Sequence, residues 1–569
     1  MGLKVKLKNF VSNYFPELVL THPINFSSSL SVLTQNKNLN DILSWPPNIF
    51  LIIYSVLDFT DKYRKIVSPT DDFSWRSSHV EDAKNLANQW LDLLSQQLNF
   101  QDHIDKSNCG GLLEKIKYVF SKDALEEDIY ILLNNSTYLK DLFVLFISID
   151  ELFSNASYCN NDGQNPVNFH ITMRKWLLDN TDNLSDAHGK LGFITLKSSV
   201  PQSGLTINNL TQYLTSIKPS VKPKIVVNKF QRNGFNKKSL NVLLLPWPNE
   251  IKPSFFKESK KVFDIDMNSF FGFFSYAPEN APSDTYIINA IEAAQLRAGS
   301  IDLIVFPECA LSEKAFDRFT TILYKKFGEN APSILSGIYC DLNGEQKNSA
   351  KLSFIGETKK YDSIEQKKHH RWFLDKNQLR NYNLATSLDP DKKWWEDMNV
   401  ERRNLLMLHS ANGLKLCPLI CEDLARQEPV AQSVRSVGPN LVISLLLDGP
   451  QISQRWPGKY SAVLSDDPGS SVLSFTSLGM TLRSTGLGNP PSRAVALWSE
   501  PQKGSETLNI DEGAIGIVME LEIKNEEMWS MDGRNKEKPV VRKIFHSSIY
   551  LEENRKSATM IHNRHFLAQ

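Results

Sequence analysis

Residues 413–428 read GLKLCPLICEDLARQE and join a short apolar run to a polar turn. The run Leu416–Ile420 predicts a buried strand, and Cys421-Glu422-Asp423 predicts a sharp turn into a helix that continues to about residue 436. Cys421 would then lie at a helix N-terminus, where the dipole and free backbone N–H groups favour a thiolate over a thiol. A small buried structural cysteine is the alternative. The stretch therefore indicates a candidate nucleophile.

Two further stretches supply groups that complement a thiol. Glu308 follows the apolar run Leu303–Phe306, so its carboxylate is expected at the C-terminal end of a strand, where open α/β folds tend to place their sites. Such a carboxylate can act as a general base toward a thiol and later toward water. Lys367 and Lys368 lie in a polar extended stretch, where an ammonium group can stabilise an oxyanion. Together these residues predict nucleophilic catalysis at Cys421.

Bulk composition indicates a globular protein of two or more domains, since the chain has 569 residues with 41% hydrophobic content. Lys+Arg and Asp+Glu are both 64, which argues against a dominant nucleic-acid or anionic membrane surface. The six cysteines form no CxxC pair and indicate a reduced protein. The first residues lack a signal-peptide core, and no apolar run approaches the ~20 residues of a membrane span. We therefore expect a cytoplasmic protein.

Differences in composition and hydrophobic spacing divide the chain into four parts. Residues 1–217 predict a mostly helical domain whose role the sequence does not reveal, with helical spacing over Glu81–Leu98 and a break near residues 134–136. Lys218–Lys238 has seven basic residues and no acidic one, and predicts a solvated linker, with a nucleic-acid contact as the alternative. Residues 239–550 predict an α/β domain, and residues 551–569 a C-terminal tail.

The α/β prediction rests on strands that alternate with helices. The clearest helices are expected at Asp284–Ala298 and Ser312–Phe327. Largely apolar runs indicate strands that are buried on both faces. These runs are Asn241–Leu245, Ile301–Phe306, Ser333–Cys340, Ala350–Ile355, Leu441–Leu447, Val472–Ser477, Ala494–Trp498 and Ala514–Glu522.

The motifs resemble the nitrilase superfamily of carbon–nitrogen hydrolases over roughly residues 239–550. Four stretches carry the resemblance: IDLIVFPECALSE (301–313), NSAKLSFIGE (348–357), QKKHHRWFLD (366–375) and LKLCPLICEDLARQEP (414–429). Each motif alone is weak, but all occur in the family's order. The resemblance implies a nitrilase-type α-β-β-α sandwich behind the helical N-terminal domain.

The resemblance also implies a Glu-Lys-Cys triad. Glu308 would be the general base and Cys421 the nucleophile, and the Cys-Glu-Asp form is similar to that of glutamine-hydrolysing domains. Lys367 fits the lysine motif through Gln366 and His369, while Lys368 remains the alternative because Trp372 falls better relative to it.

Three neighbouring residues receive supporting roles. The resemblance implies that the backbone N–H of Glu422 joins the lysine in the oxyanion site, and that Asp375 stands where many members have a second carboxylate. Asp423 is expected to accept hydrogen bonds at the start of the helix after Cys421.

The implied reaction is hydrolysis of a non-peptide carbon–nitrogen bond in a small amide or nitrile, through a thioester and without a metal or organic cofactor. The family commonly forms homo-oligomers. The alternative is a catalytically silent nitrilase-like module with a binding or regulatory role in a larger assembly, such as a bacterial defence system. In that case the N-terminal domain would bind a protein partner.

Overall fold

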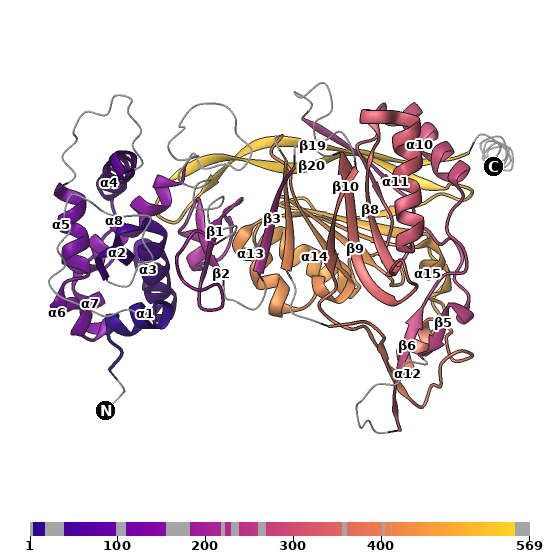
Figure 1. Cartoon of the computed structure of the whole chain (residues 1–569), viewed down its shortest axis with the longest axis horizontal. Helices are drawn as coiled ribbons and strands as arrows, with labels where there is room; N and C mark the ends of the chain where they lie inside the picture. Colours follow the sequence, from indigo (N-terminus) through magenta and orange to yellow (C-terminus); the bar gives the residue numbers. More distant parts are fainter. Residues whose placement is uncertain are drawn as a thin grey trace. The chain divides into compact units, whose positions relative to one another are not determined.

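The structure is a computed structural model that describes residues 4–17, 39–97, 110–154, 183–217, 222–228, 238–259, 269–355, 361–400, 404–410 and 412–551. It divides into two compact units (Figure 1). The helical unit comprises Met1–Lys222, Gln432–Gly438 and Glu526–Lys538, and the sandwich unit comprises Pro223–Ala431, Pro439–Asn525 and Pro539–Gln569. No helix of the described ranges is long and apolar enough to cross a membrane.

The helical unit is built mainly from short helices. These are α1 (Leu7–Tyr14), α2 (Leu39–Ser44), α3 (Pro46–Thr60), α4 (Ser77–Gln97), α5 (Gly110–Val119), α6 (Lys122–Glu126), α7 (Ile129–Asn134) and α8 (Ser136–Leu152). The predicted break near residue 135 is confirmed, because the Asn135 side chain caps α8 by accepting the N–H of Tyr138. The helical expectation missed an antiparallel pair, β1 (Phe193–Leu196) and β2 (Leu214–Ile217).

A segment far along the sequence completes the helical unit. Residues 526–538 are the tip of the hairpin formed by β19 (Gly516–Trp529) and β20 (Asn535–Ile549). At this tip the Arg534 guanidinium lies 2.9 Å from Asp150 and 3.0 Å from Glu151, both on α8. Asp532 pairs with the same guanidinium at 2.5 Å. The N-terminal 217 residues are therefore not the whole of this unit.

The sandwich unit contains two seven-stranded sheets among its described residues. The first runs β10-β9-β8-β7-β4-β19-β20, with β4 (Ser239–Leu244), β7 (Leu303–Val305), β8 (Ser333–Cys340), β9 (Gln346–Ile355) and β10 (Tyr361–Lys367). The second runs β18-β17-β16-β15-β14-β13-β3, with β3 (Lys222–Asn228), β13 (Asn404–Ser410), β14 (Lys415–Ile420), β15 (Leu441–Leu446), β16 (Ser471–Thr476), β17 (Ala494–Glu500) and β18 (Gly504–Asn509).

Strand alternation sends neighbouring side chains of the first sheet into different cores. Val242 and Leu244 of β4 join one buried cluster with Ile443 of the second sheet, so the two sheets face each other. Leu243 points the other way, into a cluster with helices α10 (Asp284–Ala298) and α11 (Glu313–Phe327), which cover the first sheet (Figure 1).

Helix α14 (Trp456–Asp466) packs against β16 and β17 of the second sheet. The layers are therefore helix, sheet, sheet, helix, and the α/β prediction is confirmed. The remaining helices are α12 (Lys376–Asn381), α13 (Gln432–Val437) and α15 (Leu478–Arg483). A small sheet of order β11-β12-β6-β5 adds β5 (Phe256–Glu258), β6 (Phe271–Tyr276), β11 (Phe373–Leu374) and β12 (Lys393–Glu396).

The observed bounds of the helices and strands around the parallel strands agree closely with the bounds predicted from the sequence. The helix at Asp284–Ala298 and the strand at Ser333–Cys340 have the predicted bounds, and Ser312 caps α11. The expected linker differs, because Lys222–Asn228 forms the edge strand β3 of the second sheet. Residues 218–221 and 229–237 of that segment lie outside the described residues, as do 552–569 of the expected tail and Cys109 and Cys159.

Candidate functional site

Cys421 lies in a strained turn directly after β14. Its φ is +46°, in the left-handed region that non-glycine residues rarely adopt, and its side chain is buried. Holding such a residue costs roughly 1–3 kcal/mol, and strain of this kind gathers at functional sites. The predicted sharp turn is confirmed. The predicted continuous helix is wrong, because a single 3₁₀ turn, Cys421–Leu424, is followed by the non-helical residue Glu428 before α13 begins.

The charge state of Cys421 also differs from expectation. Burial raises the pKa of its thiol well above the ordinary value, and the negative charge of Glu308 raises it further, while Lys368 opposes both effects only in part. A single 3₁₀ turn has too few aligned peptide groups to offset this burial. The thiol form of Cys421 is therefore favoured, and any attack by its sulfur would require a base.

Glu308 lies three residues beyond β7, and its carboxylate is 1% exposed. Oε1 accepts hydrogen bonds from Asn348 Nδ2 at 2.7 Å and Lys368 Nζ at 2.8 Å. Oε2 accepts the backbone N–H of Leu447 at 2.6 Å, just after β15. Burial raises the pKa of Glu308, although the Lys368 charge pulls it down. The carboxylate is thus fixed in position and more basic than one in water.

Gly337 on β8 lets the Glu308 turn pack against the neighbouring strand. A Cβ at residue 337 would come within 2.4 Å of the Glu308 Cα and 2.5 Å of the Pro307 carbonyl oxygen. The Gly337 N–H donates to that same carbonyl at 3.1 Å. A larger residue would push the candidate base away from its hydrogen-bond donors.

Of the two candidate lysines, the structure brings Lys368 to the site and not Lys367. Lys367 ends β10 opposite Ser349 and is exposed, whereas the Lys368 side chain is fully buried. Strand alternation explains the difference, because Gln366 is buried and its neighbour Lys367 must point to the other face. The preference for Lys367 is therefore corrected to the alternative, Lys368.

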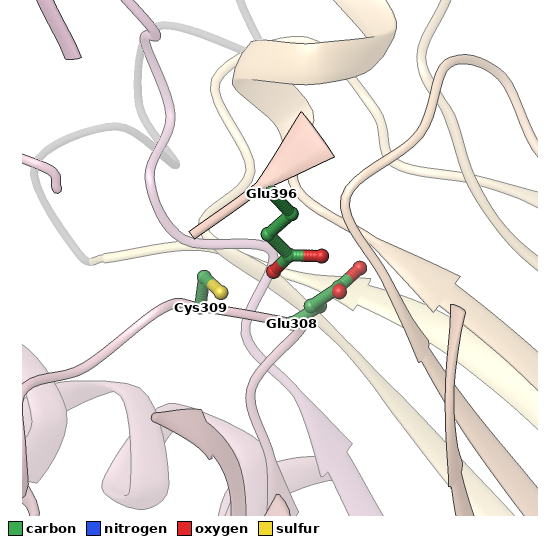
Figure 2. A group of neighbouring side chains, drawn as sticks. All are labelled: Glu308, Cys309 and Glu396. Atoms are coloured by element: carbon green, nitrogen blue, oxygen red, sulfur yellow. The ribbon is translucent and has the colours of Figure 1, made fainter. Parts of the chain in front are cut away.

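A second carboxylate lies beside Lys368, but it is Glu396 and not Asp375. Glu396 Oε2 lies 2.7 Å from Lys368 Nζ and accepts the Trp372 N–H at 2.9 Å. Figure 2 shows its carboxylate pointing toward that of Glu308. Asp375 instead caps α12 by accepting the N–H of Gln378 at 2.8 Å.

The sequence contains a signal for Glu396 that motif reasoning passed over. In the segment Lys393–Glu396, alternation places Trp394 and Glu396 on the same face of one strand. Trp394 is 1% exposed, so a carboxylate two residues later points toward the interior. Asn348 begins the stretch NSAKLSFIGE and was given no role of its own in the sequence analysis. It contacts the site, because its Nδ2 donates hydrogen bonds to both Glu308 and Glu396.

The ion pairs of Lys368 with Glu308 and Glu396 help to decide whether these two carboxylates could hold a metal ion. Ligand atoms of Glu308, Cys309 and Glu396 lie within 4.8 Å of one another, as metal ligands would (Figure 2). Both carboxylates, however, already share the ammonium of Lys368 at 2.7–2.8 Å. Burial lowers the pKa of Lys368, but the charges of Glu308 and Glu396 outweigh it and hold that pKa well above its ordinary value, which favours the charged form. The donor set fits a lysine-centred site better than a metal centre.

Glu422 and Cys417 occupy positions that limit their roles. The Glu422 carboxylate turns away to pair with Arg426, at 2.7 Å from its Nε, so only its backbone N–H is a candidate for an oxyanion site. Cys417 is buried in the middle of β14 opposite Val442, where burial raises its pKa. This position suits Cys417 to packing in the core between the strands.

Comparison with known proteins finds similar folds at low identity. The sequence matches no protein-family model and no curated relative. A carbon-nitrogen hydrolase from Helicobacter pylori G27 is 12% identical, with a TM-score of 0.29 over 57% of this chain and 93% of that one. Saccharomyces cerevisiae Nit3, a member of branch 10 of the nitrilase superfamily, is 10% identical, with a TM-score of 0.28 over 59% and 97%.

A glutamine-dependent NAD(+) synthetase from Cytophaga hutchinsonii is 9% identical, with a TM-score of 0.23 over 55% of this chain and 43% of that one. The chain is similar to carbon–nitrogen hydrolases. At these identities and TM-scores the similarity supplies no argument about activity, so the case for function rests on the geometry of the site.

Proposed function

We propose that the chain is a nitrilase-type, thiol-dependent hydrolase that acts on a non-peptide carbon–nitrogen bond of an amide or nitrile. The observation that carries the proposal is the buried ammonium of Lys368, held at 2.8 Å from Glu308 and close enough to Cys421, whose backbone is strained, for their charges to interact. A base, a cation and a nucleophile from three distant segments meet in one buried place. Burying these groups is costly, and this favours a catalytic over a structural purpose.

In the first step Cys421 Sγ attacks the amide carbon while Glu308 takes the thiol proton. The raised pKa of Cys421 means that little thiolate exists beforehand, so the proton must leave as the carbon–sulfur bond forms. The raised pKa of Glu308 makes it a suitable acceptor. The product is a tetrahedral intermediate with its negative charge on the former carbonyl oxygen.

Lys368 Nζ and the backbone N–H of Glu422 are the donors that we assign to this oxyanion. Lys368 is fixed between Glu308 and Glu396 at 2.8 and 2.7 Å, so it needs no reorganisation when the charge develops. Glu396 and Asn348 hold the lysine and the base in place. They act through their neighbours, and we assign them positioning roles.

In the second half of the reaction Glu308 returns its proton to the leaving nitrogen, the carbon–nitrogen bond breaks, and ammonia or an amine departs. A thioester remains on Cys421. Glu308 then removes a proton from water, the hydroxide attacks the thioester carbon, and the carbon–sulfur bond breaks as Glu308 returns that proton to Cys421 Sγ. The carboxylic acid leaves and the thiol is restored. With a nitrile, attack by the thiol gives a thioimidate, one water adds to it, and loss of ammonia leaves the same thioester.

Intact-mass analysis of the full chain tests this proposal, after incubation with a panel of primary amides, nitriles and glutamine. An acyl adduct that maps to Cys421 in the wild type, and that forms far more slowly in Glu308→Gln, is the expected result. Cys417→Ala is the matched control, because it removes a buried cysteine of the same strand and should leave the adduct unchanged. Iodoacetamide should label Cys421 faster in the wild type than in Glu308→Gln.

The catalytically silent module is the outcome that would overturn the proposal. It predicts no adduct with any compound and no release of ammonia. It also predicts equal, slow alkylation of Cys421 in the wild type and in Glu308→Gln, because Glu308 would then have no role as a base.

A further inference from the structure

Asp448 is a buried carboxylate beside the site that the mechanism above does not use. It follows Leu447, whose N–H binds Glu308 Oε2 at 2.6 Å, and it is 4% exposed. Its negative charge is close enough to Cys421 to raise the pKa of that thiol. Three elements that end here, β7, β14 and β15, therefore bring Glu308, Cys421 and Asp448 to one region.

The two oxygens of Asp448 have different surroundings. Oδ1 accepts hydrogen bonds from Tyr382 Oη and from Arg455 Nη2, the latter at 2.8 Å. Oδ2 is buried and has no hydrogen-bond partner among the residues that the structure describes. A buried acceptor without a donor costs roughly 1–3 kcal/mol. That cost is removed when a ligand supplies the donor.

The loop that carries Asp448 is held rigidly, so Oδ2 cannot easily turn toward another donor. The Asp448 N–H donates to Thr476 Oγ1 at 3.2 Å, and that hydroxyl donates back to the Asp448 carbonyl at 2.7 Å. A Cβ at residue 449 would lie 2.5 Å from Ser484 Oγ, so a larger residue there would force the neighbouring side chains to move. Burial keeps Tyr382 protonated by raising its pKa well above the ordinary value, which makes it a constant donor to Oδ1.

The charges around this oxygen favour a cation. Three carboxylates, Glu308, Glu396 and Asp448, pair with two basic side chains, Lys368 and Arg455. One negative charge remains in excess when all five are ionised. A substrate carboxylate would add to that excess, whereas an ammonium group would neutralise it and make a charge-assisted hydrogen bond.

We propose that Asp448 Oδ2 accepts a hydrogen bond from an ammonium group of the substrate, and that the preferred substrates are primary amides that carry such a group a few bonds from the scissile carbon. This inference rests on the proposed function and names its substrate class. Asp448 is a specificity residue in this scheme, and the covalent chemistry stays with Cys421 and Glu308.

Three amides of similar size test the inference on the wild-type enzyme, with kcat/KM measured by ammonia release. 4-Aminobutanamide carries the ammonium, pentanamide replaces it with a methyl group, and succinamate carries a carboxylate in place of the terminal CH2–NH3+ group. We expect 4-aminobutanamide to exceed pentanamide by about tenfold or more, because charge-assisted hydrogen bonds are roughly twice as strong as neutral ones. Succinamate should be the poorest. Equal or better turnover of pentanamide would overturn the inference.

Two variants distinguish a role of Asp448 in substrate recognition from a purely structural role. Asp448→Asn keeps an acceptor for Tyr382 and removes the charge, so the ratio of kcat/KM for 4-aminobutanamide to kcat/KM for pentanamide should fall by about tenfold. Tyr382→Phe removes a donor to Oδ1 and leaves Oδ2 unchanged, so the preference should persist. A purely structural role for Asp448 predicts an equal fall for both amides. If Asp448→Asn does not fold, the wild-type comparison decides.

Calorimetric binding to Cys421→Ala distinguishes failure of this inference from failure of the proposed function. Tighter binding of 4-aminobutanamide than of pentanamide, with no turnover in the wild type, would support the recognition site and overturn the hydrolase. Turnover without any preference would overturn the recognition site and keep the hydrolase. Neither turnover nor preferential binding would overturn both.

Discussion

Asp423 is hydrogen-bonded to His370, with Oδ1 of the carboxylate 2.8 Å from Nδ1 of the imidazole. The same carboxylate accepts the backbone N–H of His370 at 3.2 Å and of His369 at 3.0 Å. Asp423 was expected to cap a helix, but its contacts are with the loop that follows Lys368. The turn that carries the thiol and the loop that carries the ammonium are therefore joined through one buried carboxylate.

Replacing this carboxylate should disturb catalysis without removing a reacting group. In Asp423→Ala we expect kcat to fall by about 100-fold, since a misplacement of about 1 Å can cost that much. The matched control is His370→Ala, which loses the side-chain contact but keeps both backbone hydrogen bonds, and it should lose less than tenfold by the same reasoning. Steady-state ammonia release measures both variants. An unchanged kcat in Asp423→Ala would show that the loop holds its position without Asp423.

Replacing each of the two adjacent lysines with Met should have very different effects on activity and stability. Lys368→Met removes the oxyanion donor, so kcat should fall by about 100- to 1,000-fold. It also leaves Glu308 and Glu396 without their cation, which should destabilise the sandwich unit by about 3–5 kcal/mol. Lys367→Met changes an exposed side chain and should alter stability by no more than about 0.5 kcal/mol.

Urea unfolding and ammonia release together measure both lysine variants. The expected pattern is a large loss of activity and stability in one and neither in the other. Comparable losses in the two variants would contradict the geometric assignment of Lys368.

Sequence patterns located the proposed base and the proposed nucleophile because each lies within three residues of the end of an apolar strand. Glu308 and Cys421 are fixed by local signals, the Pro-Glu after β7 and the turn after β14. The lysine was ambiguous because Lys367 and Lys368 are adjacent, and a shift of one residue reverses the face of a strand. Only the observed end of β10 at Lys367 resolves it.

Long-range features were not predictable from local patterns. Glu396 reaches the site because β12 pairs in parallel with β6, a partner more than a hundred residues earlier. Residues 526–538 belong to the helical unit, where Arg534 pairs with Asp150 and Glu151 of α8. Neither pairing leaves a periodic trace in the sequence, because a strand pattern reports its burial and not its partner.

The pH dependence of the reaction should report on Glu308, and Asn348 offers a way to shift it. Glu308 must be ionised to accept the thiol proton, so kcat/KM should fall as pH falls through its pKa. Burial raises that pKa above 4.5, and the hydrogen bond from Asn348 lowers it by stabilising the ionised form. Asn348→Leu should therefore move the acid limb of the pH profile to higher pH.

The control for this shift is a group that contacts Glu396 but not Glu308. Arg371 donates to the backbone carbonyl of Glu396 at 2.6 Å, so Arg371→Leu should leave the acid limb in place. A profile of kcat/KM against pH from 4 to 9 measures both variants. An acid limb that stays fixed in Asn348→Leu would mean that another group controls it.

The ion pairs of Arg534 should contribute strongly to the stability of the helical unit. Its guanidinium is the cation for Asp150 and Asp532, whose side chains are fully buried. Arg534→Met leaves both charges uncompensated, so we expect a loss of about 3–5 kcal/mol. Lys84→Ala breaks an exposed pair with Glu81 and should cost no more than about 1 kcal/mol.

Hydrogen exchange in Arg534→Met should become faster in α8 and in residues 526–538 together, because the hairpin tip and the helix share one buried charge cluster. Faster exchange at the tip alone would mean that α8 does not depend on it.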